Sequence, residues 1–376
     1  MKCIVNGRMV LSDQILEGYA IVFDDKIRAI VPEGEIKAEN YEIIDAQGQL
    51  VMPGLVDLHI HGYLGQDASD GSEEGLRIMA KGLVKNGVTS WCPTTMTVAK
   101  ETLVKAYGAV RTVRAEKPCG AKILGVNCEG PFINPKKKGA QPEEYILPPD
   151  GDFILQHADI LKLVTVAPEV EGALDCIEQI AKDGRVVVSM GHTDASCEEA
   201  REGVFAGVGH VTHLFNGMTG LHHRDPGVVG VALTADVSCE LIADTFHVAP
   251  DLFSRVAKLK GDKLCLITDC MRAGGMEDGE YTLGGQKVVK KGIQCLLKDG
   301  TIAGSVLKLN EAVRNLKEYT NLSLSEAVAC ASLNPAKAIA MDAEIGSLEV
   351  GKWADIVLCD EAFRVLQTFV DGKRTL

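Results

Sequence analysis

Hydrophobic and polar positions follow two different patterns along the chain. From residue 1 to about residue 49, short apolar stretches alternate with Gly, Asp and Pro turn signals, which indicates β-strands and no convincing helix. The same pattern returns from about residue 345 onward. Because the two ends of a chain often lie close together, these stretches predict one small discontinuous β-sandwich domain, built from residues 1–50 and 345–376.

The middle of the chain, residues 51–344, alternates short apolar segments with helical patterns. This alternation is typical of βα units and a parallel sheet, and near-continuous apolar runs are typical of strands buried on both faces. The pattern predicts an α/β fold of the (β/α)8 TIM-barrel type. Its eight strands are expected at residues 55–60, 89–93, 122–128, 161–167, 185–190, 210–214, 240–244 and 263–268.

One further segment departs from the βα alternation. Residues 279–303 alternate in hydrophobicity between glycine-rich turns, which predicts β-hairpins inserted after the eighth strand. The sequence does not indicate what this insertion does.

Composition narrows the classes of function. A barrel commonly needs about 250 residues, so 376 residues accommodate one barrel and a small accessory domain. With a net charge of -13, the chain is not expected to have the basic surface of a nucleic-acid-binding protein. An anionic substrate would need a local basic pocket in this negatively charged protein. No apolar run reaches the roughly 18 residues of a membrane span, and no secretion signal is expected. Twelve scattered cysteines without a C-x-x-C pair favour reduced thiols in a cytoplasmic protein.

Two histidines close the first predicted barrel strand. In PGLVDLHIHG, His59 and His61 are two residues apart, so their side chains point to the same face of the strand. This spacing suits two ligands of one cation. The alternative is a pair of inward polar residues satisfied by hydrogen bonds. The pair lies at the carboxyl end of its strand, where barrel enzymes build their active sites.

Four more ionisable residues occupy equivalent places at the ends of other predicted strands: Glu129, His192, His213 and Asp269. Taken singly, each histidine could be structural and the aspartate could cap a helix. Together they predict a metal site, because strand ends on one rim of a barrel converge in space. The neighbouring Cys128 and Cys270 should face the other way and serve in packing.

The predicted ligands also indicate the chemistry. Imidazole and carboxylate without thiolate suit Zn, Fe or a similar divalent ion, and open coordination positions mark a catalytic site. His59 and His61 with Glu129 could hold one ion, while Glu129 with His192 and His213 could hold a second; the sequence permits two metals without requiring them. A bound cation lowers the pKa of water from about 15.7 to about 7 and polarises a carbonyl oxygen, and amide hydrolysis needs both. Asp269 is the expected proton carrier, with a purely structural ligand as its alternative.

Several motifs carry a resemblance to a known family over essentially the whole chain. EGPFINPKKKGA, THLFNGM and HHRDPG, together with PGLVDLHIHG and GSLEVGKWADIV, resemble the N-acetylglucosamine-6-phosphate deacetylases of the amidohydrolase superfamily. The resemblance implies hydrolysis of N-acetylglucosamine 6-phosphate to glucosamine 6-phosphate and acetate, in amino-sugar catabolism and cell-wall sugar recycling. It implies that Glu129, His192 and His213 are metal ligands and Asp269 the catalytic acid and base. With the H-x-H pair present, the chain resembles the branch that can hold two metals.

The same resemblance implies residues that bind the phosphosugar. Arg224 and His247 match the phosphate contacts, and Arg224 would act across the interface of a homodimer; a surface salt bridge is its alternative. Asn216 and Gly217 match donors beside the phosphate, where Gly217 replaces an expected alanine. Ala140 belongs to the expected active-site loop, whose residues 136–138 could equally be a solvated run of charge. His222 and His223 are expected near the site or the interface rather than as ligands.

Three other interpretations stay open. Another amidohydrolase, such as a cyclic amidase or a nucleobase deaminase, would share the metal rim and differ in its substrate loops. A deacetylase for the galactosamine epimer would share nearly everything. A barrel without catalysis, kept for assembly or binding, would belong to a different class. The native metal, the number of filled sites and the size of the oligomer do not follow from the sequence.

Overall fold

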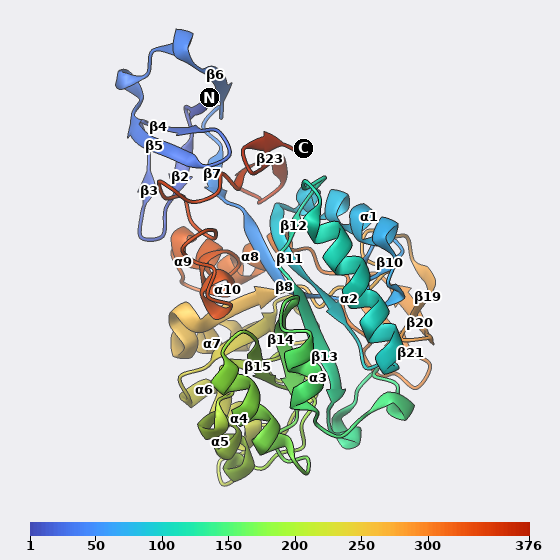
Figure 1. Cartoon of the computed structure of the whole chain (residues 1–376). Helices are drawn as coiled ribbons and strands as arrows, with labels where there is room; N and C mark the ends of the chain where they lie inside the picture. Colours follow the sequence, from blue (N-terminus) through green and yellow to red (C-terminus); the bar gives the residue numbers. More distant parts are fainter.

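Eight parallel strands of the middle segment form the central sheet in the computed structural model, which describes all residues from 1 to 376 (Figure 1). Neighbouring strands pair in chain order, and a parallel bridge between Ile60 and Cys270 joins the last strand to the first. The predicted barrel is therefore confirmed. In order, the strands are β8 (Leu55–Ile60), β11 (Val88–Thr95), β13 (Val126–Phe132), β14 (Leu161–Val166), β15 (Val187–Met190), β16 (His210–Val211), β17 (Ser238–Ile242) and β18 (Leu264–Ile267).

Two predicted strands differ from their expected bounds by more than two residues. The segment expected at residues 122–128 divides into β12 (Lys122–Ile123) and β13, because the chain kinks at Gly125, whose φ is +156°. The segment expected at residues 210–214 ends at Val211, because the backbone turns away and reaches a left-handed φ of +27° at His213. Apolar character alone does not reveal such kinks.

Helices cover the outside of the sheet, as Figure 1 shows for α1 to α6. Several begin where the sequence supplies a cap: Ser72 caps α1, and Ser196 with Glu199 forms a capping box at α5. The helices are α1 (Glu73–Leu83), α2 (Lys100–Ala115), α3 (Gly151–Gln156), α4 (Ala173–Asp183), α5 (Cys197–Ala206), α6 (Gly227–Thr234), α7 (Phe253–Lys260), α8 (Leu309–Tyr319), α9 (Leu324–Ala329) and α10 (Leu333–Ala338).

The predicted β-insertion is a three-stranded antiparallel sheet at the mouth of the barrel. It comprises β19 (Gly279–Leu283), β20 (Gln286–Lys291) and β21 (Gln294–Leu297). Its apolar side chains, including Leu283, form a small core with Met96 and Ala140 from the barrel loops. A two-stranded ribbon, β9 (Gly62–Tyr63) with β10 (Gln66–Asp67), follows the first barrel strand. The insertion thus forms part of the wall around the barrel mouth.

Both chain ends fold together into two stacked sheets beside the barrel (Figure 1). Buried side chains of the two sheets, such as Phe23 and Phe369, meet edge to face between them. The predicted discontinuous sandwich is confirmed. One sheet contains β5 (Ile27–Pro32), β4 (Tyr19–Phe23), β1 (Lys2–Val5) and β6 (Glu42–Asp45); the other contains β24 (Lys373–Arg374), β23 (Val365–Val370), β22 (Ile356–Cys359), β7 (Leu50–Pro53), β2 (Arg8–Val10) and β3 (Ile15–Leu16).

Strand β7 belongs to the terminal sheet and ends at Pro53, two residues before the first barrel strand begins at Leu55. We therefore propose Gly54 as the join between the domains, a few residues beyond the expected boundary at residue 50. An ion cluster lies at this junction. Lys122 Nζ is 2.9 Å from Asp355 Oδ2 and 2.5 Å from Asp371 Oδ1.

None of the helices combines the length and the apolar character that crossing a membrane requires. All twelve cysteines are unpaired.

Candidate metal centre and substrate pocket

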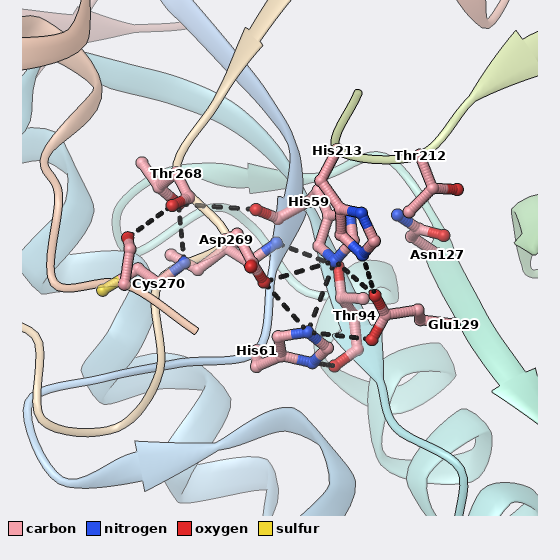
Figure 2. Close-up of polar contacts among 12 residues, drawn as sticks. His59, His61, Thr94, Asn127, Glu129, Thr212, His213, Thr268, Asp269 and Cys270 are labelled. Carbon is pink, nitrogen blue, oxygen red and sulfur yellow. Dashed lines mark hydrogen bonds and ion pairs between the residues drawn. The ribbon is translucent and has the colours of Figure 1, made fainter. Parts of the chain in front are cut away.

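The five predicted ligands and the predicted proton carrier, Asp269, come together at the carboxyl ends of the barrel strands. His59 and His61 come from the end of β8, and Glu129 lies within β13. His192, His213 and Asp269 each follow their strand by two residues. Figure 2 shows the rings and carboxylates of His59, His61, Glu129, His213 and Asp269 pointing toward one another. All six residues are buried.

Glu129 is the centre of this cluster. Its Oε1 lies 2.9 Å from His213 Nε2 and 3.0 Å from His192 Nε2. Its Oε2 lies 3.2 Å from His61 Nε2, and Asp269 Oδ1 lies 3.2 Å from the same nitrogen. The side chains divide into two groups that could each hold a cation: His59, His61 and Asp269, and Glu129, His192 and His213. Glu129 contacts both groups, in keeping with the expected bridging carboxylate.

The outer nitrogen of every clustered histidine faces an acceptor. Nδ1 of His192 lies 2.8 Å from the Lys137 carbonyl oxygen, and Nδ1 of His61 lies 3.2 Å from that of Thr94. Nδ1 of His213 lies 3.1 Å from the Asn216 carbonyl oxygen. A carbonyl oxygen only accepts, so these rings carry hydrogen on Nδ1 and, when neutral, direct the Nε2 lone pair inward. This is the usual second contact of a metal-binding histidine.

Inward lone pairs make the cluster fit a divalent cation. Nε2 of His192 is 3.1 Å from Nε2 of His213, and the corresponding atoms of His59 and His61 are 3.3 Å apart. Two neutral imidazole lone pairs facing each other at such distances repel. Two nitrogens bound to one tetrahedral ion at about 2.05 Å would be about 3.3 Å apart. The donor types and their spacing thus match the expected site.

The pKa shifts of the clustered residues also favour a cation at this site. Burial opposes protonation of His61, but the charges of Glu129 and Asp269 outweigh it and raise its pKa to about 10. Burial would raise the pKa of Glu129, but the surrounding histidines hold it well below its ordinary value. Without a metal the cluster therefore retains protons as its positive charge. A divalent cation would supply that charge directly.

Three of the six residues have left-handed backbones, which is uncommon outside glycine. The φ angles are +48° at His192, +27° at His213 and +48° at Asp269. Such conformations cost about 1–3 kcal/mol each and persist where neighbouring contacts fix them. The Asp269 amide, for example, donates to the His59 carbonyl oxygen at 2.8 Å. The turns direct side chains from the strand ends over the barrel mouth.

A cavity of about 260 Å³ opens beside this cluster. Four of the predicted substrate residues line it: Ala140, Asn216, Gly217 and His247. Burial would lower the pKa of His247, but Asp244, whose Oδ2 lies 2.6 Å from Nδ1, raises it overall. Gly217 has a φ of +60°, and a Cβ there would lie 3.2 Å from His192 Nδ1, so glycine suits this position. Insertion residue Leu283 and loop residue Met96 add an apolar wall.

Arg224 is the predicted site residue that the chain does not bring to the cavity. Its side chain is exposed, and its guanidinium Nη1 lies 2.7 Å from Nε2 of His223. His222 and His223 are also exposed and apart from the ligand groups. In the basic run, the Lys137 carbonyl contacts His192, whereas the ammonium group of Lys137 lies 3.6 Å from Asp194. That segment therefore contacts the centre through its backbone.

Sequence reasoning missed two buried polar residues of the site. Gln141 donates through Nε2 to Glu129 and accepts from the Thr97 amide at 2.7 Å. Glu240 accepts from His59 and is 1% exposed. Gln141 directly follows the expected loop residue Ala140. Glu240 is a charged residue within an apolar strand, SCELI, and that contrast was a usable signal.

Comparison with known proteins agrees with this geometry. The model of the Amidohydrolase family matches residues 50–375. The chain belongs to the amidohydrolase family.

Named relatives of this amidohydrolase are close in sequence and structure. N-acetylglucosamine-6-phosphate deacetylase of Bacillus subtilis (strain 168) is 40% identical over 372 residues, covering 96% of this chain and 93% of the relative. N-acetylgalactosamine-6-phosphate deacetylase of Escherichia coli O157:H7 is 37% identical over 336 residues, covering 88% and 89%. The crystal structure of N-acetylglucosamine-6-phosphate deacetylase from Pasteurella multocida superposes with a TM-score of 0.95 at 32% identity, covering 99% of both chains.

Proposed function

We propose that this amidohydrolase hydrolyses the acetamido bond of N-acetylglucosamine 6-phosphate, giving glucosamine 6-phosphate and acetate for amino-sugar catabolism or cell-wall sugar recycling. The observation that best supports this proposal is one cavity, lined both by members of the two candidate ligand groups and by the polar residues Asn216 and His247. Relatives with the deacetylase name cover nearly the whole chain. The unpaired cysteines support a reducing compartment such as the cytoplasm.

We further propose that one or two divalent ions, Zn, Fe or similar, are held by His59, His61 and Asp269 and by Glu129, His192 and His213. Imidazole and carboxylate donors without thiolate suit these metals. A bound cation would lower the pKa of water and polarise the acetyl carbonyl. Glu129, in contact with both groups, would bridge them.

Asp269 is the proposed proton carrier. Its carboxylate lines the cavity. Burial alone would raise its pKa, but the hydrogen bond and charges of His59 and His61 lower it. It is therefore ionised at neutral pH and can accept a proton from the attacking water. The same proton then goes to the sugar nitrogen as the carbon-nitrogen bond breaks, so that the amine leaves and acetate forms.

The other end of the cavity would hold the sugar phosphate. His247 presents its ring there with Nδ1 engaged by Asp244, which leaves Nε2 to donate to an anion. Asn216 and the backbone N–H of Gly217 would add donors, and Ala140 would contact the sugar. The chain's net charge of -13 makes local cations necessary for an anionic substrate.

Arg224 would supply a further cation from the partner of a homodimer. This assignment is supported by its exposure outside the cavity of its own chain and by Leu221, 62% exposed in the same loop. A guanidinium pairs with phosphate through two parallel hydrogen bonds.

Mixed dimers test whether Arg224 acts across the interface. We expect Arg224→Ala and Asp269→Asn each to be nearly inactive, and a mixture of the two, dissociated and reassociated, to recover about a quarter of wild-type turnover. In the mixed dimer, one site then contains both Asp269 and the partner's arginine. If the mixture stays inactive while native mass spectrometry shows mixed dimers, Arg224 acts within its own chain.

Acetate release decides the substrate. We expect turnover of N-acetylglucosamine 6-phosphate, with kcat/KM reduced at least a hundredfold for unphosphorylated N-acetylglucosamine. We expect slower turnover of N-acetylgalactosamine 6-phosphate than of its epimer. This comparison tests the alternative substrate, for which one of the relatives is named. Equal rates with and without phosphate would contradict the proposal.

A further inference from the structure

A buried carboxylate links the two candidate ligand groups from behind. Glu240 lies in the middle of β17, the strand SCELI, and its side chain is 1% exposed. It does not line the cavity and cannot touch the substrate. Burial of an ionisable group costs several kcal/mol unless partners compensate. Its partners therefore explain why a charged residue lies within an apolar strand.

Those partners belong to both ligand groups. Glu240 Oε2 lies 2.9 Å from Nδ1 of His59 and 2.9 Å from the backbone nitrogen of His213. The Glu240 backbone carbonyl accepts from the Leu214 amide at 2.9 Å. Its other carboxylate oxygen, Oε1, lies 3.2 Å from Nε2 of His210. One oxygen atom thus contacts one member of each candidate metal group.

His59 differs from the other three clustered histidines in what holds its ring. The Nδ1 atoms of His61, His192 and His213 all face backbone carbonyl oxygens, which no substitution removes. Nδ1 of His59 faces a side chain. The tautomer of His59, and with it the inward lone pair on Nε2, therefore depends on the identity of residue 240.

The contact to His213 fixes a backbone rather than a ring. His213 has a left-handed φ of +27°, a conformation that needs external support. The carboxylate accepts from its amide, and the backbone carbonyl of the same residue accepts from Leu214. Both bonds attach the turn after β16 to β17. They hold the His213 side chain where its Nε2 lies 2.9 Å from Glu129.

We propose that Glu240 is a positioning residue for the metal centre, which through one carboxylate oxygen sets the tautomer of His59 and the backbone turn of His213. The proposal rests on the metal site of the proposed function. Outer partners of this kind typically change metal affinity by 10- to 100-fold. Loss of Glu240 weakens the group containing His59 most, because that ring loses its only outer acceptor.

Three variants separate positioning from general stability. Glu240→Ala removes the acceptor, and Glu240→Gln keeps one oxygen of similar shape. Asp355→Asn is the matched control, because Asp355 is a carboxylate of similar burial, 4% exposed, at the domain junction away from the centre. Each protein is freed of metal and titrated with Zn²⁺ against a chelator, with no substrate present. The readout therefore holds whether or not the substrate assignment is right.

We expect Glu240→Ala to bind Zn²⁺ 10- to 100-fold less tightly, with kcat falling and KM nearly unchanged. Glu240→Gln should recover part of the loss. Asp355→Asn should melt at a lower temperature with unchanged Zn²⁺ affinity. If Glu240→Ala lowers the melting temperature as the control does and leaves the Zn²⁺ affinity of the folded protein unchanged, the proposal is wrong.

The wild-type protein offers a second test that no misfolded variant can spoil. Nitrogen-15 NMR of the Zn²⁺-loaded protein with labelled histidine reports which ring nitrogen of each histidine carries hydrogen. We expect His59 to carry hydrogen on Nδ1, the nitrogen that faces Glu240. A wild-type His59 with hydrogen on Nε2 alone would overturn the assignment.

Discussion

Two ion clusters at opposite ends of the same barrel differ in the source of their positive charge. At the amino end, Lys122 lies between Asp355 and Asp371 and supplies the positive charge itself. At the carboxyl end, Glu129 and Asp269 face histidines whose Nε2 atoms point at one another, and no lysine or arginine belongs to the cluster. The first cluster is complete as a structural contact. The second could exchange its protons for a divalent cation, and this capacity would distinguish a binding site from a structural ion pair.

The largest expected effect concerns the proton carrier at the carboxyl end. Asp269→Asn keeps an oxygen ligand and removes the base, so kcat for acetate release should fall by about 10²–10⁴. The metal content, measured by mass spectrometry of the purified protein, should remain close to wild type. Near-normal turnover with the metal bound would reduce Asp269 to a ligand.

A substitution in the amino-end cluster should change the stability of the protein and not its turnover. Lys122→Met leaves the buried Asp355 and the half-buried Asp371 without their cation, which should lower the free energy of unfolding by about 3 kcal/mol. The kcat of the folded protein should not change. Lys337→Met is the matched control, because its partner Asp262 is exposed and the pair contributes below about 1 kcal/mol. A loss of activity in Lys122→Met without a loss of stability would remove the distinction between the clusters. Urea titration and acetate assays measure both.

The pH should separate the clusters as well. In the metal-free centre the pKa of His61 is raised from 6.5 to about 10, so between these values a cation must displace a proton. Zn²⁺ affinity should therefore rise about tenfold per pH unit for each proton displaced, and fall as the pH is lowered. Burial would lower the pKa of Lys122, but its two carboxylates raise it, so the junction keeps its cation throughout. Chelator competition at several pH values checks this; a flat profile between pH 7 and 9 would contradict it.

The smallest expected effect is at the rim of the cavity. Gly217→Ala places a Cβ 3.2 Å from His192 Nδ1 in a left-handed backbone and should cost about 1 kcal/mol. Turnover should change less than about threefold, because only the backbone N–H of this residue is assigned to the substrate. Thermal melting with steady-state assays measures both quantities. A loss of turnover beyond about tenfold would mean that His192 cannot give way.

The barrel and the ionisable residues at its rim could be predicted because both depend on local patterns. Apolar strands alternate with amphipathic helices, and the ionisable residues follow strand ends whose convergence is a property of the fold. Where strands end could not be predicted, since His213 and Gly125 turn the chain through backbone conformations that hydrophobicity does not encode.

Contacts between residues on distant strands could not be predicted from the sequence. Glu240 meets His59 only because the sheet closes on itself, and those residues are 181 positions apart. Arg224 was assigned to the substrate by resemblance, and its own chain leaves it outside the cavity. Its proposed role depends on a second copy of the chain.

The most direct test of the metal requirement is a titration of metal-free protein with Zn²⁺ or Fe²⁺ while acetate release from N-acetylglucosamine 6-phosphate is followed. We expect activity near background without metal, rising linearly to a break at one or two equivalents per chain. Full turnover by the metal-free protein, or added metal that binds without restoring turnover, would contradict the account.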